Sequence, residues 1–372
     1  MKIGLIIYGS LDTLSGGYLY DRKLVEYLRA QGDDVRILSL PWRNYAAHLA
    51  DNLSFRMPPG LDVLIEDELN HPSLIGANLR RRSQSAVISL VHHLRCSELR
   101  PRWQNALYRM IESRYLKSVD GFIFNSQTTR GVVTALVGDR RPALVAYPPT
   151  DRFGSGLSET VIHARVAEPG PLRLLFLGNI IPRKGLHTLL KSLSTLRAQS
   201  GTKEGPFPIL DVVGSLDVDP VYAQAMQAYA AVHCPPSSVF FHGALDNTPL
   251  LEKLQQAHVL VVPSSYEGFG IVYLEGMACG LPAIGTTAGA ASEIIDDGET
   301  GFLIEPDDDI ALSIRLQTLA ADRDLLTRLS LNALARYRRQ PTWEQTAGSI
   351  RDFLVEMVEL RRKQVNTYQV PG

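Results

Sequence analysis

The chain has 372 residues, of which 45% are hydrophobic and 21% charged. This composition is ordinary for a globular protein and excludes disordered and fibrous architectures, and the length predicts two domains. No stretch approaches the roughly 20 apolar residues of a membrane span, and the first residues predict a buried strand rather than a signal peptide. Cys96, Cys234 and Cys279 are too far apart for a disulfide framework or a cysteine-based zinc site. We therefore expect a cytoplasmic protein.

The net charge of −1 is unevenly distributed along the chain. Residues 1–165 hold 21 Lys and Arg against 16 Asp and Glu, whereas residues 166–372 hold 17 against 23. The cations are concentrated in residues 76–117, where only Glu98 and Glu112 are acidic. Two interpretations stay open: a solvated face, or a surface that contacts phosphates or anionic lipid headgroups at the inner face of the cell membrane. The aromatic residues of this segment form no stacking pattern, which argues against nucleic acid.

The first half of the chain alternates short β-rich runs with helical patterns. Residues 18–31 form the first predicted helix, after a polar loop that ends in Ser15-Gly16-Gly17. The predicted strands are 2–8, 35–40, 63–65, 86–91, 121–124 and 143–146. This alternation predicts a parallel sheet with helices on both faces. The proline- and glycine-rich residues 148–171 are typical of a domain linker.

A second α/β series follows the linker. Its predicted strands are 173–177, 209–213, 239–241, 259–262, 283–285 and 301–304, and its predicted helices are 184–197, 220–232, 248–257, 271–279 and 308–321. Residues 343–361 form an amphipathic helix. We therefore predict two Rossmann-like, doubly wound α/β domains, 1–165 and 166–342, that face a central cleft. Ligands bind such sheets at the carboxyl ends of the strands.

The most informative stretch is 261–282, where a buried strand is followed by a glycine-bearing turn and a helix that starts near Ile271. The amides from Gly270 to Val272 would lie at the helix N-terminus, whose partial positive charge suits an anion such as a diphosphate. Glycine at positions 268 and 270 lets a ligand approach the backbone closely.

Two glutamates accompany this predicted anion site. Glu267 lies in the turn and Glu275 lies in the helix. A carboxylate beside a phosphate is electrostatically costly unless it accepts hydrogen bonds from hydroxyl groups, such as those of a ribose or a sugar. The alternative for each is a solvated glutamate, but two glutamates with a glycine turn form a joint pattern that favours a ligand.

A second strand–loop–helix pattern runs from Phe176 to Leu186. Arg183 and Lys184 stand at its helix start, where the helix dipole disfavours cations. A cationic pair in that place suggests an anionic ligand, and the alternative is a pair of exposed surface charges. Arginine offers phosphate oxygens a planar fork, and lysine offers a point charge.

These two segments together resemble the family 4 glycosyltransferases, which are retaining enzymes of the GT-B fold. The resemblance is strong over residues 171–310 and loose over 1–150. Its motifs are the two glutamates separated by seven residues, a phosphate loop and two further matches: Glu267 and Glu275, Gly178–Gly185, Gly285–Ile295 and Gly298–Leu303.

The resemblance implies a nucleotide-sugar donor, UDP- or GDP-linked, held mainly by the C-terminal domain. It implies a hydroxyl acceptor, such as a lipid-linked or cell-envelope glycan precursor, held by the N-terminal domain. It also implies that the terminal helix, about 343–372, crosses back onto the first domain. The expected reaction moves a hexosyl group with retention, and it needs no cofactor, no metal ion and no protein nucleophile.

Site residues follow from the same resemblance. It assigns the donor ribose to Glu275, the sugar hydroxyls to Glu267 and the diphosphate to Arg183 and Lys184. His92 matches a histidine near the reaction centre, with His93 as the alternative. The expected backbone contacts come from Gly16 and Gly17 in the first domain, and from Gly268, Phe269, Gly270 and Ile271 in the second.

The same sequence offers alternatives to this family. Asp217 and Asp219 match the metal-binding Asp-x-Asp of the other large glycosyltransferase fold, but we interpret them as a surface loop, and no cluster has metal-ligand spacing. A nicotinamide-dependent oxidoreductase would need Gly-x-Gly-x-x-Gly after a strand, and this chain lacks that register. A sugar-nucleotide epimerase of the same fold and a non-catalytic nucleotide-sugar-binding protein stay open, because both would keep the nucleotide pocket.

Overall fold

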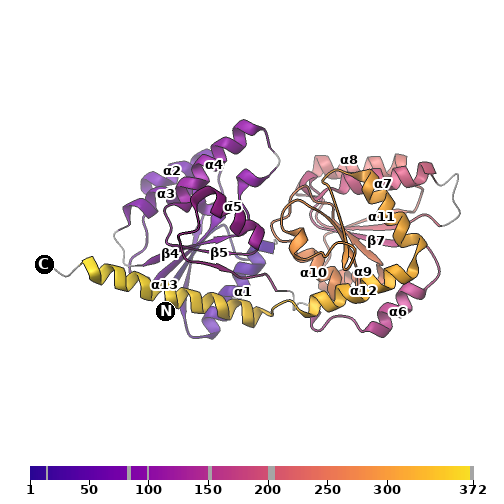
Figure 1. Cartoon of the computed structure of the whole chain (residues 1–372). Coiled ribbons are helices and arrows are strands. Elements are labelled where there is room, and N and C mark those ends of the chain that lie inside the picture. Colours follow the sequence, from indigo (N-terminus) through magenta and orange to yellow (C-terminus); the bar gives the residue numbers. More distant parts are fainter. Residues whose placement is uncertain (14–15, 82–84, 99, 150–152, 200–205, 369–372) are drawn as a thin grey trace. The chain divides into compact units, whose positions relative to one another are not determined.

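The computed structural model describes residues 1–13, 16–81, 85–98, 100–149, 153–199 and 206–368 (Figure 1). The chain divides into two compact units, the first formed by Met1–Pro149 with Pro341–Gly372 and the second by Thr150–Gln340. Within the described ranges, no helix combines the length and the apolar character needed to cross a membrane. The three cysteines are free and buried.

The boundary between the units differs from the predicted one after residue 165, which falls inside α6 (Glu159–Ala167). This helix belongs to the second unit because both an apolar and a charged side chain of it make contacts there. Ile162 is fully buried against Gly280, and the Arg165 guanidinium donates to the carbonyl oxygens of Cys279 and Gly280 at 2.8 and 2.9 Å. The chain therefore changes unit at Pro149, near the start of the predicted linker.

The first unit is built on a six-stranded parallel sheet of order β2-β1-β3-β4-β5-β6. Its strands are β1 (Lys2–Tyr8), β2 (Asp34–Leu40), β3 (Val63–Asp67), β4 (Ala86–Val91), β5 (Gly121–Phe124) and β6 (Ala143–Val145). Its helices are α1 (Gly16–Ala30), α2 (Tyr45–Ser54), α3 (His71–Arg80), α4 (Arg102–Leu116), α5 (Gln127–Val137) and α13 (Trp343–Tyr368), with short 3-10 turns η1 (Glu68–Asn70) and η2 (Arg95–Ser97).

Both faces of this sheet are covered, as continuous apolar strands of a parallel sheet require. Along β1, Ile3, Leu5 and Ile7 join a core with residues of α1 and α13. Ile6 points to the other face and joins a core with residues of α3, α4 and α5. The α/β class and the parallel sheet predicted from the sequence are confirmed.

The C-terminal helix α13, drawn in yellow in Figure 1, packs on the first unit. The apolar face expected of this amphipathic helix is buried, and it includes Ile350, Phe353, Leu354, Met357 and Val358. The Arg351 guanidinium donates to the buried Asp33 carboxylate at 2.8 Å, and the Asp33 carboxylate also accepts from the amino group of Met1 at 2.6 Å. The first and last parts of the chain are thus joined by one carboxylate.

The second unit repeats the architecture, with a six-stranded parallel sheet of order β12-β11-β10-β7-β8-β9. Its strands are β7 (Arg173–Leu177), β8 (Ile209–Val213), β9 (Val239–Gly243), β10 (Val259–Val261), β11 (Ala283–Thr286) and β12 (Gly301–Ile304). Besides α6, its helices are α7 (Leu186–Gln199), α8 (Pro220–His233), α9 (Asn247–Gln256), α10 (Ile271–Ala278), α11 (Asp309–Ala321) and α12 (Arg323–Arg338). The sequence analysis did not single out α12. Since β7 and β10 are neighbours, the loops that follow them leave the sheet side by side.

We expect Leu354→Ala to destabilise the first unit by about 2–5 kcal/mol, because it opens a cavity under α13 where the side chain is fully buried. Leu360→Ala, on the same helix but 36% exposed, is the matched control and should cost less than about 0.5 kcal/mol. Urea unfolding followed by hydrogen exchange of the β1 amides measures both. Equal losses for the two variants would contradict the placement of α13.

Candidate functional site

Two loops of the second unit form one surface. The loop after β7 includes the 3-10 turn η4 (Pro182–Lys184), and the loop after β10 leads to α10. The Ser265 amide donates to the Arg183 carbonyl oxygen at 2.8 Å. Gly185 has a φ of +74°, and a Cβ there would stand 2.0 Å from the Pro263 carbonyl oxygen. Glycine at 185 is therefore required for the two loops to meet.

Lys184 and Glu267 form an ion pair across these two loops. The Lys184 Nζ donates to Glu267 Oε2 at 2.7 Å, and the two side chains are only 13% and 10% exposed. The Ser264 hydroxyl donates to the same oxygen at 3.1 Å. Burial raises the pKa of Glu267, but Lys184 and Arg183 together hold it below its usual value. The Glu267 carboxylate is therefore ionised, and it holds the Lys184 ammonium group in an ion pair.

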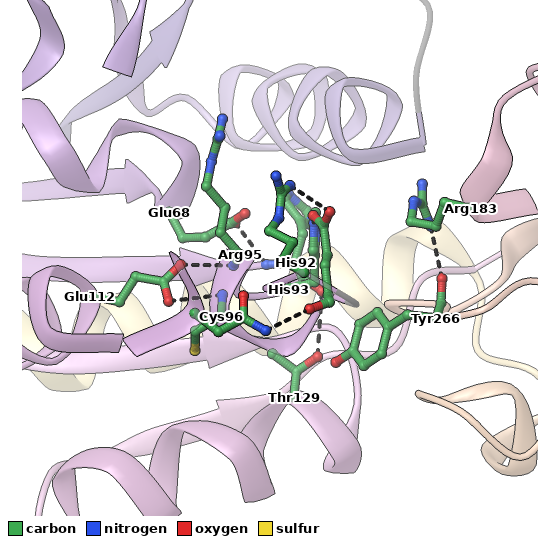
Figure 2. Close-up of polar contacts among 12 residues, drawn as sticks. Glu68, His92, His93, Arg95, Cys96, Glu112, Thr129, Arg183 and Tyr266 are labelled. Atoms are coloured by element: carbon green, nitrogen blue, oxygen red, sulfur yellow. Dashed lines mark hydrogen bonds and ion pairs between the residues drawn. The ribbon is translucent and has the colours of Figure 1, made fainter. Parts of the chain in front are cut away.

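Arg183 lies beside this pair. Its Nη1 donates to the Tyr266 carbonyl oxygen at 2.9 Å, as Figure 2 shows. This contact uses one of the five N–H donors of the guanidinium. Lys184 closes η4, and α7 begins at Leu186 rather than at 184 as predicted. The two cations therefore belong to the loop, which removes the conflict with the helix dipole that the sequence suggested.

The turn before α10 is fixed by glycine. Gly270 caps the helix with a φ of +99°, and a Cβ there would lie 2.5 Å from the Tyr273 ring. The Glu267 carbonyl oxygen accepts from the Ala290 amide at 2.8 Å, and Gly289 leaves room for that contact. The helix starts at Ile271 as predicted, so the first amides of α10 lie where intrahelical partners are absent and an anion is favoured.

Sequence and structure agree on which residues of the second unit lie together. Arg183, Lys184, Glu267 and the turn 268–271 share one surface, and Glu275 follows on α10, where it is 6% exposed. Their roles as ligands of a donor remain predictions. Asp219 caps α8 by accepting from the Tyr222 amide at 3.1 Å, which gives it a structural role. Asp217 is exposed.

In the first unit, His92 and Gly17 are neighbours. His92 follows β4, and a Cβ at Gly17 would lie 3.4 Å from His92 Cδ2. Gly16 and Gly17 are the first residues of α1 rather than the end of a loop, and Ser15 lies outside the described residues. His93 turns to Glu98, with Nε2 3.1 Å from Oε1. Of the two histidines, His92 therefore lies beside the glycines.

Three buried carboxylates surround His92. Its Nε2 lies 3.3 Å from Asp21 Oδ1, and its backbone amide donates to Glu68 Oε2 at 2.9 Å, a contact drawn in Figure 2. Burial lowers the pKa of His92, but Asp21, Glu68 and Asp67 outweigh this effect and raise it to about 9. The ring is therefore protonated at neutral pH, with the Asp21 carboxylate in direct contact with it.

Asp21, Asp67 and Glu68 were missed by the sequence analysis. A signal was present in the sequence. Asp21 stands one helical turn after Gly17, Asp67 ends β3, the strand next to β4, and Glu68 follows it. In the described part of the chain, Asp21, Asp67 and His92 form a group whose ligand atoms lie within 4.8 Å of one another. This group could hold a metal ion, although linear spacing indicated none. The expectation of a metal-independent site remains a prediction.

The charge of His92 makes a testable prediction. The folded pKa lies above the value of about 6.5 for a free imidazole, so the stabilisation it brings is complete below about pH 6.5 and is lost as the pH rises through about 9. We expect an NMR titration of the ring to give a midpoint near 9, and Asp21→Asn to lower it.

Glu98→Gln is the matched control, because it removes the partner of His93 and leaves the groups around His92 in place. A wild-type midpoint at or below the free-imidazole value would contradict the assignment. So would an unchanged midpoint in Asp21→Asn.

Comparisons with known proteins find a family model, curated relatives and solved structures that match this chain in part or in full. The model of the family described as "Glycosyl transferases group 1" matches residues 159–336. A glycogen synthase of Mycobacterium tuberculosis (strain CDC 1551 / Oshkosh) is 31% identical over 211 residues, which cover 53% of this chain and 49% of the relative. The chain spans about half the length of the curated relatives it matches.

Solved structures show the same fold. Sucrose-phosphate synthase of Thermosynechococcus elongatus superposes with a TM-score of 0.76 at 21% identity, covering 98% of this chain and 99% of that one. Anabaena Alr3699/HepE in complex with UDP-glucose gives a TM-score of 0.69 at 17% identity, covering 99% and 100%. The two parallel sheets and their helices are those of GT-B structures. The part of this chain that is similar to the group 1 glycosyltransferases is residues 159–336, which make up most of the second unit.

Proposed function

We propose that this protein is a retaining glycosyltransferase that moves a hexosyl group from a UDP- or GDP-linked sugar to a hydroxyl acceptor. The observation that carries the proposal is the single surface formed by Arg183, the Lys184–Glu267 pair and the start of α10. It offers cations and helix amides to a diphosphate, and a carboxylate to sugar hydroxyls. The family match and the UDP-glucose bound to the Anabaena protein support a nucleotide-sugar donor.

The chemistry of transfer fits these groups. Breaking the bond between the anomeric carbon and the phosphate oxygen leaves positive charge on the sugar and negative charge on the diphosphate. Donors fixed in place at the departing oxygens lower this barrier, and one such donor is worth about 2.7–4 kcal/mol in comparable oxyanion sites. Arg183, Lys184 and the amides at Ile271 and Val272 would supply them. Glu267 holds Lys184 in this place before a donor binds.

The remaining groups bind and orient the substrates. Glu275 would accept hydrogen bonds from the ribose hydroxyls, and Glu267 from those of the sugar. In a front-face reaction with retention, the acceptor oxygen bonds to the anomeric carbon as the phosphate oxygen leaves, and that phosphate oxygen takes the acceptor proton. No side chain then acts as a covalent nucleophile. The His92 imidazolium would donate a hydrogen bond near the transferred sugar.

The two open alternatives predict different products. An epimerase would convert one nucleotide-sugar into another, and a binding protein would leave it unchanged. A transferase releases free nucleotide in amounts that depend on the acceptor. Incubation with a panel of nucleotide-sugars, with and without acceptor extracts, separates the three. Acceptor-dependent release of nucleotide indicates a transferase, a new nucleotide-sugar indicates an epimerase, and an unchanged nucleotide-sugar indicates a binding protein.

Two substitutions test the donor site. We expect Glu275→Gln to weaken binding of the nucleotide-sugar, because an amide accepts ribose hydrogen bonds less well than a carboxylate. We expect Arg183→Ala mainly to slow turnover, by about 10²–10³ fold if it acts on the leaving phosphate. Calorimetric titration with a panel of UDP- and GDP-sugars, beside steady-state kinetics, measures both.

The matched controls are Glu252→Gln and Arg328→Ala, which change exposed side chains of the same unit. Both should leave affinity and turnover unchanged. Wild-type affinity for the donor in both Glu275→Gln and Arg183→Ala would remove the basis of the site assignment.

The basic segment also has a structural counterpart. Helix α4 exposes three large apolar side chains, Trp103, Leu107 and Met110, at 68%, 44% and 46%. Its exposed charged residues are all basic: Arg102, Arg109, Arg114 and the following Lys117. Its one acidic residue, Glu112, is buried. We propose that this outward face of α4 docks on an anionic membrane surface, where an apolar stripe flanked by cations is favoured.

Co-sedimentation with vesicles tests the docking face. We expect binding to vesicles of phosphatidylcholine mixed with phosphatidylglycerol, because each basic residue near an anionic surface contributes about 1 kcal/mol. We expect loss of binding in Leu107→Glu. Val221→Glu, at an 81% exposed position of α8, is the matched control and should bind normally. Binding that does not depend on the fraction of anionic lipid or on the salt concentration would contradict the proposal.

A further inference from the structure

Arg95 is a cation that lacks a counter-ion within its own unit. It opens η2, three residues after His92, and its side chain is half-buried. Its guanidinium lies over the Tyr45 ring, 5.6 Å from the centroid. Across the described residues, no hydrogen bond or ion pair of this guanidinium is present. A half-buried arginine without an acid is costly unless a ligand supplies the negative charge.

The two carboxylates nearest in the sequence, Glu98 and Glu112, each bind other groups. Glu98 pairs with His93 at 3.1 Å and with Arg100 at 2.7 Å, and these cations lower its pKa to about 2 despite its burial. The Glu112 carboxylate accepts hydrogen bonds from backbone amides. Among the described residues of the first unit, no carboxylate is therefore free to neutralise Arg95, and a bound anion would do so.

The turn that carries Arg95 is held in place by a buried acid. Glu112, 1% exposed on α4, accepts from the Arg95 amide at 2.7 Å and from the Cys96 amide at 3.2 Å (Figure 2). Burial raises the pKa of Glu112, so this anchor carries a free-energy cost. We therefore infer that this cost is retained because the turn must hold Arg95 in a fixed position to bind a ligand.

Aromatic rings frame the guanidinium. Tyr45 and Tyr108 meet edge to face with centroids 5.1 Å apart, and Arg100 lies over the Tyr108 ring at 5.5 Å. Two cations therefore flank two rings. Stacking on a ring occupies the face of a guanidinium and leaves its N–H edge free for a bidentate contact with an oxyanion.

A hydrogen-bonded chain connects this place to His92. The Tyr45 hydroxyl lies 2.9 Å from His71 Nε2, and His71 Nδ1 lies 2.8 Å from the Glu68 carbonyl oxygen. Burial lowers the pKa of His71 to about 3, so the ring is neutral, with Nδ1–H donating to Glu68 and Nε2 accepting from Tyr45. Glu68 also binds the His92 amide. Tyr45 thus has a fixed orientation relative to His92.

We propose that Arg95, framed by Tyr45, Tyr108 and Arg100, binds a phosphate group carried by the acceptor. The identification of the ligand as the acceptor rests on the proposed function, whereas the anion site itself does not. A planar fork on a fixed turn fits a phosphomonoester, and the adjoining rings suit the apolar face of a sugar or polyol. This subsite does not use the outward face of α4.

The experiment titrates the full chain, saturated with UDP, with glycerol 3-phosphate in a calorimeter. UDP keeps the phosphate away from Arg183 and Lys184. We expect saturable binding to the wild type, at least tenfold weaker binding to Arg95→Ala, and an intermediate value for Arg95→Lys, which keeps the charge but loses the fork. Glycerol, which has no charge, should not bind.

Matched controls separate this site from general charge and from the donor. Arg130→Ala removes an exposed cation on α5 of the same unit and should bind glycerol 3-phosphate as the wild type does. UDP affinity, measured in the same samples, should be unchanged in Arg95→Ala, which also shows that the variant is folded. In turnover with a phosphorylated acceptor, Arg95→Ala should raise the acceptor KM and leave the donor KM unchanged.

Two results would overturn the subsite: no saturable binding of glycerol 3-phosphate to the wild type at millimolar concentration, or equal binding to wild type and Arg95→Ala. Failure of the proposed function would look different. In that case UDP would not bind, and the titration would be repeated in Arg183→Ala, where loss of affinity on adding Arg95→Ala would still support the anion site.

Discussion

The Lys184–Glu267 ion pair joins the two loops on which the second unit's candidate site depends. Two charges withdrawn from water must compensate each other, since an isolated buried charge costs several kcal/mol. The 2.7 Å contact, with the Ser264 hydroxyl on the same oxygen, meets that demand. A ligand phosphate near Lys184 would compete with Glu267 for the ammonium group, so donor binding is coupled to the state of this pair. Sugar hydroxyls on Glu267 would compensate the carboxylate.

The two units use opposite charge at their strand ends. In the second, two loop cations and helix amides create positive potential beside a single carboxylate that faces Lys184. In the first, Asp21, Asp67 and Glu68 create negative potential around His92 and keep it charged. The second unit is therefore suited to bind an anion beside the Lys184–Glu267 pair, and the first unit is suited to hold a buried proton donor at His92. This division follows from local geometry within each unit.

The sequence predicted the elements and much of the second site because both are encoded locally. Neighbouring residues alone indicate the order of strand, turn and helix. The glycines at 268 and 270 mark the turn and, with it, the start of α10. What it missed depends on contacts distant in sequence. Asp21 meets His92 across 71 residues, and Arg165 reaches Cys279 across 114, which places α6 in the second unit. No periodicity within a short window carries such information.

Glu68 shows how one residue sets two histidines in different states. Its carbonyl oxygen accepts from His71, and its carboxylate accepts from the His92 amide. Both rings are largely buried, yet the pKa of His71 falls to about 3 while that of His92 rises to about 9. The two rings differ in the charge of the groups that they contact. His71 faces a carbonyl, a hydroxyl and the Arg95 cation, and none of these favours an imidazolium as a carboxylate does. His92 faces the Asp21 carboxylate directly. Burial alone would make both rings neutral, so the charge of His92 depends on Asp21 and its acidic neighbours, and the neutrality of His71 fixes the tautomer that orients Tyr45 under Arg95.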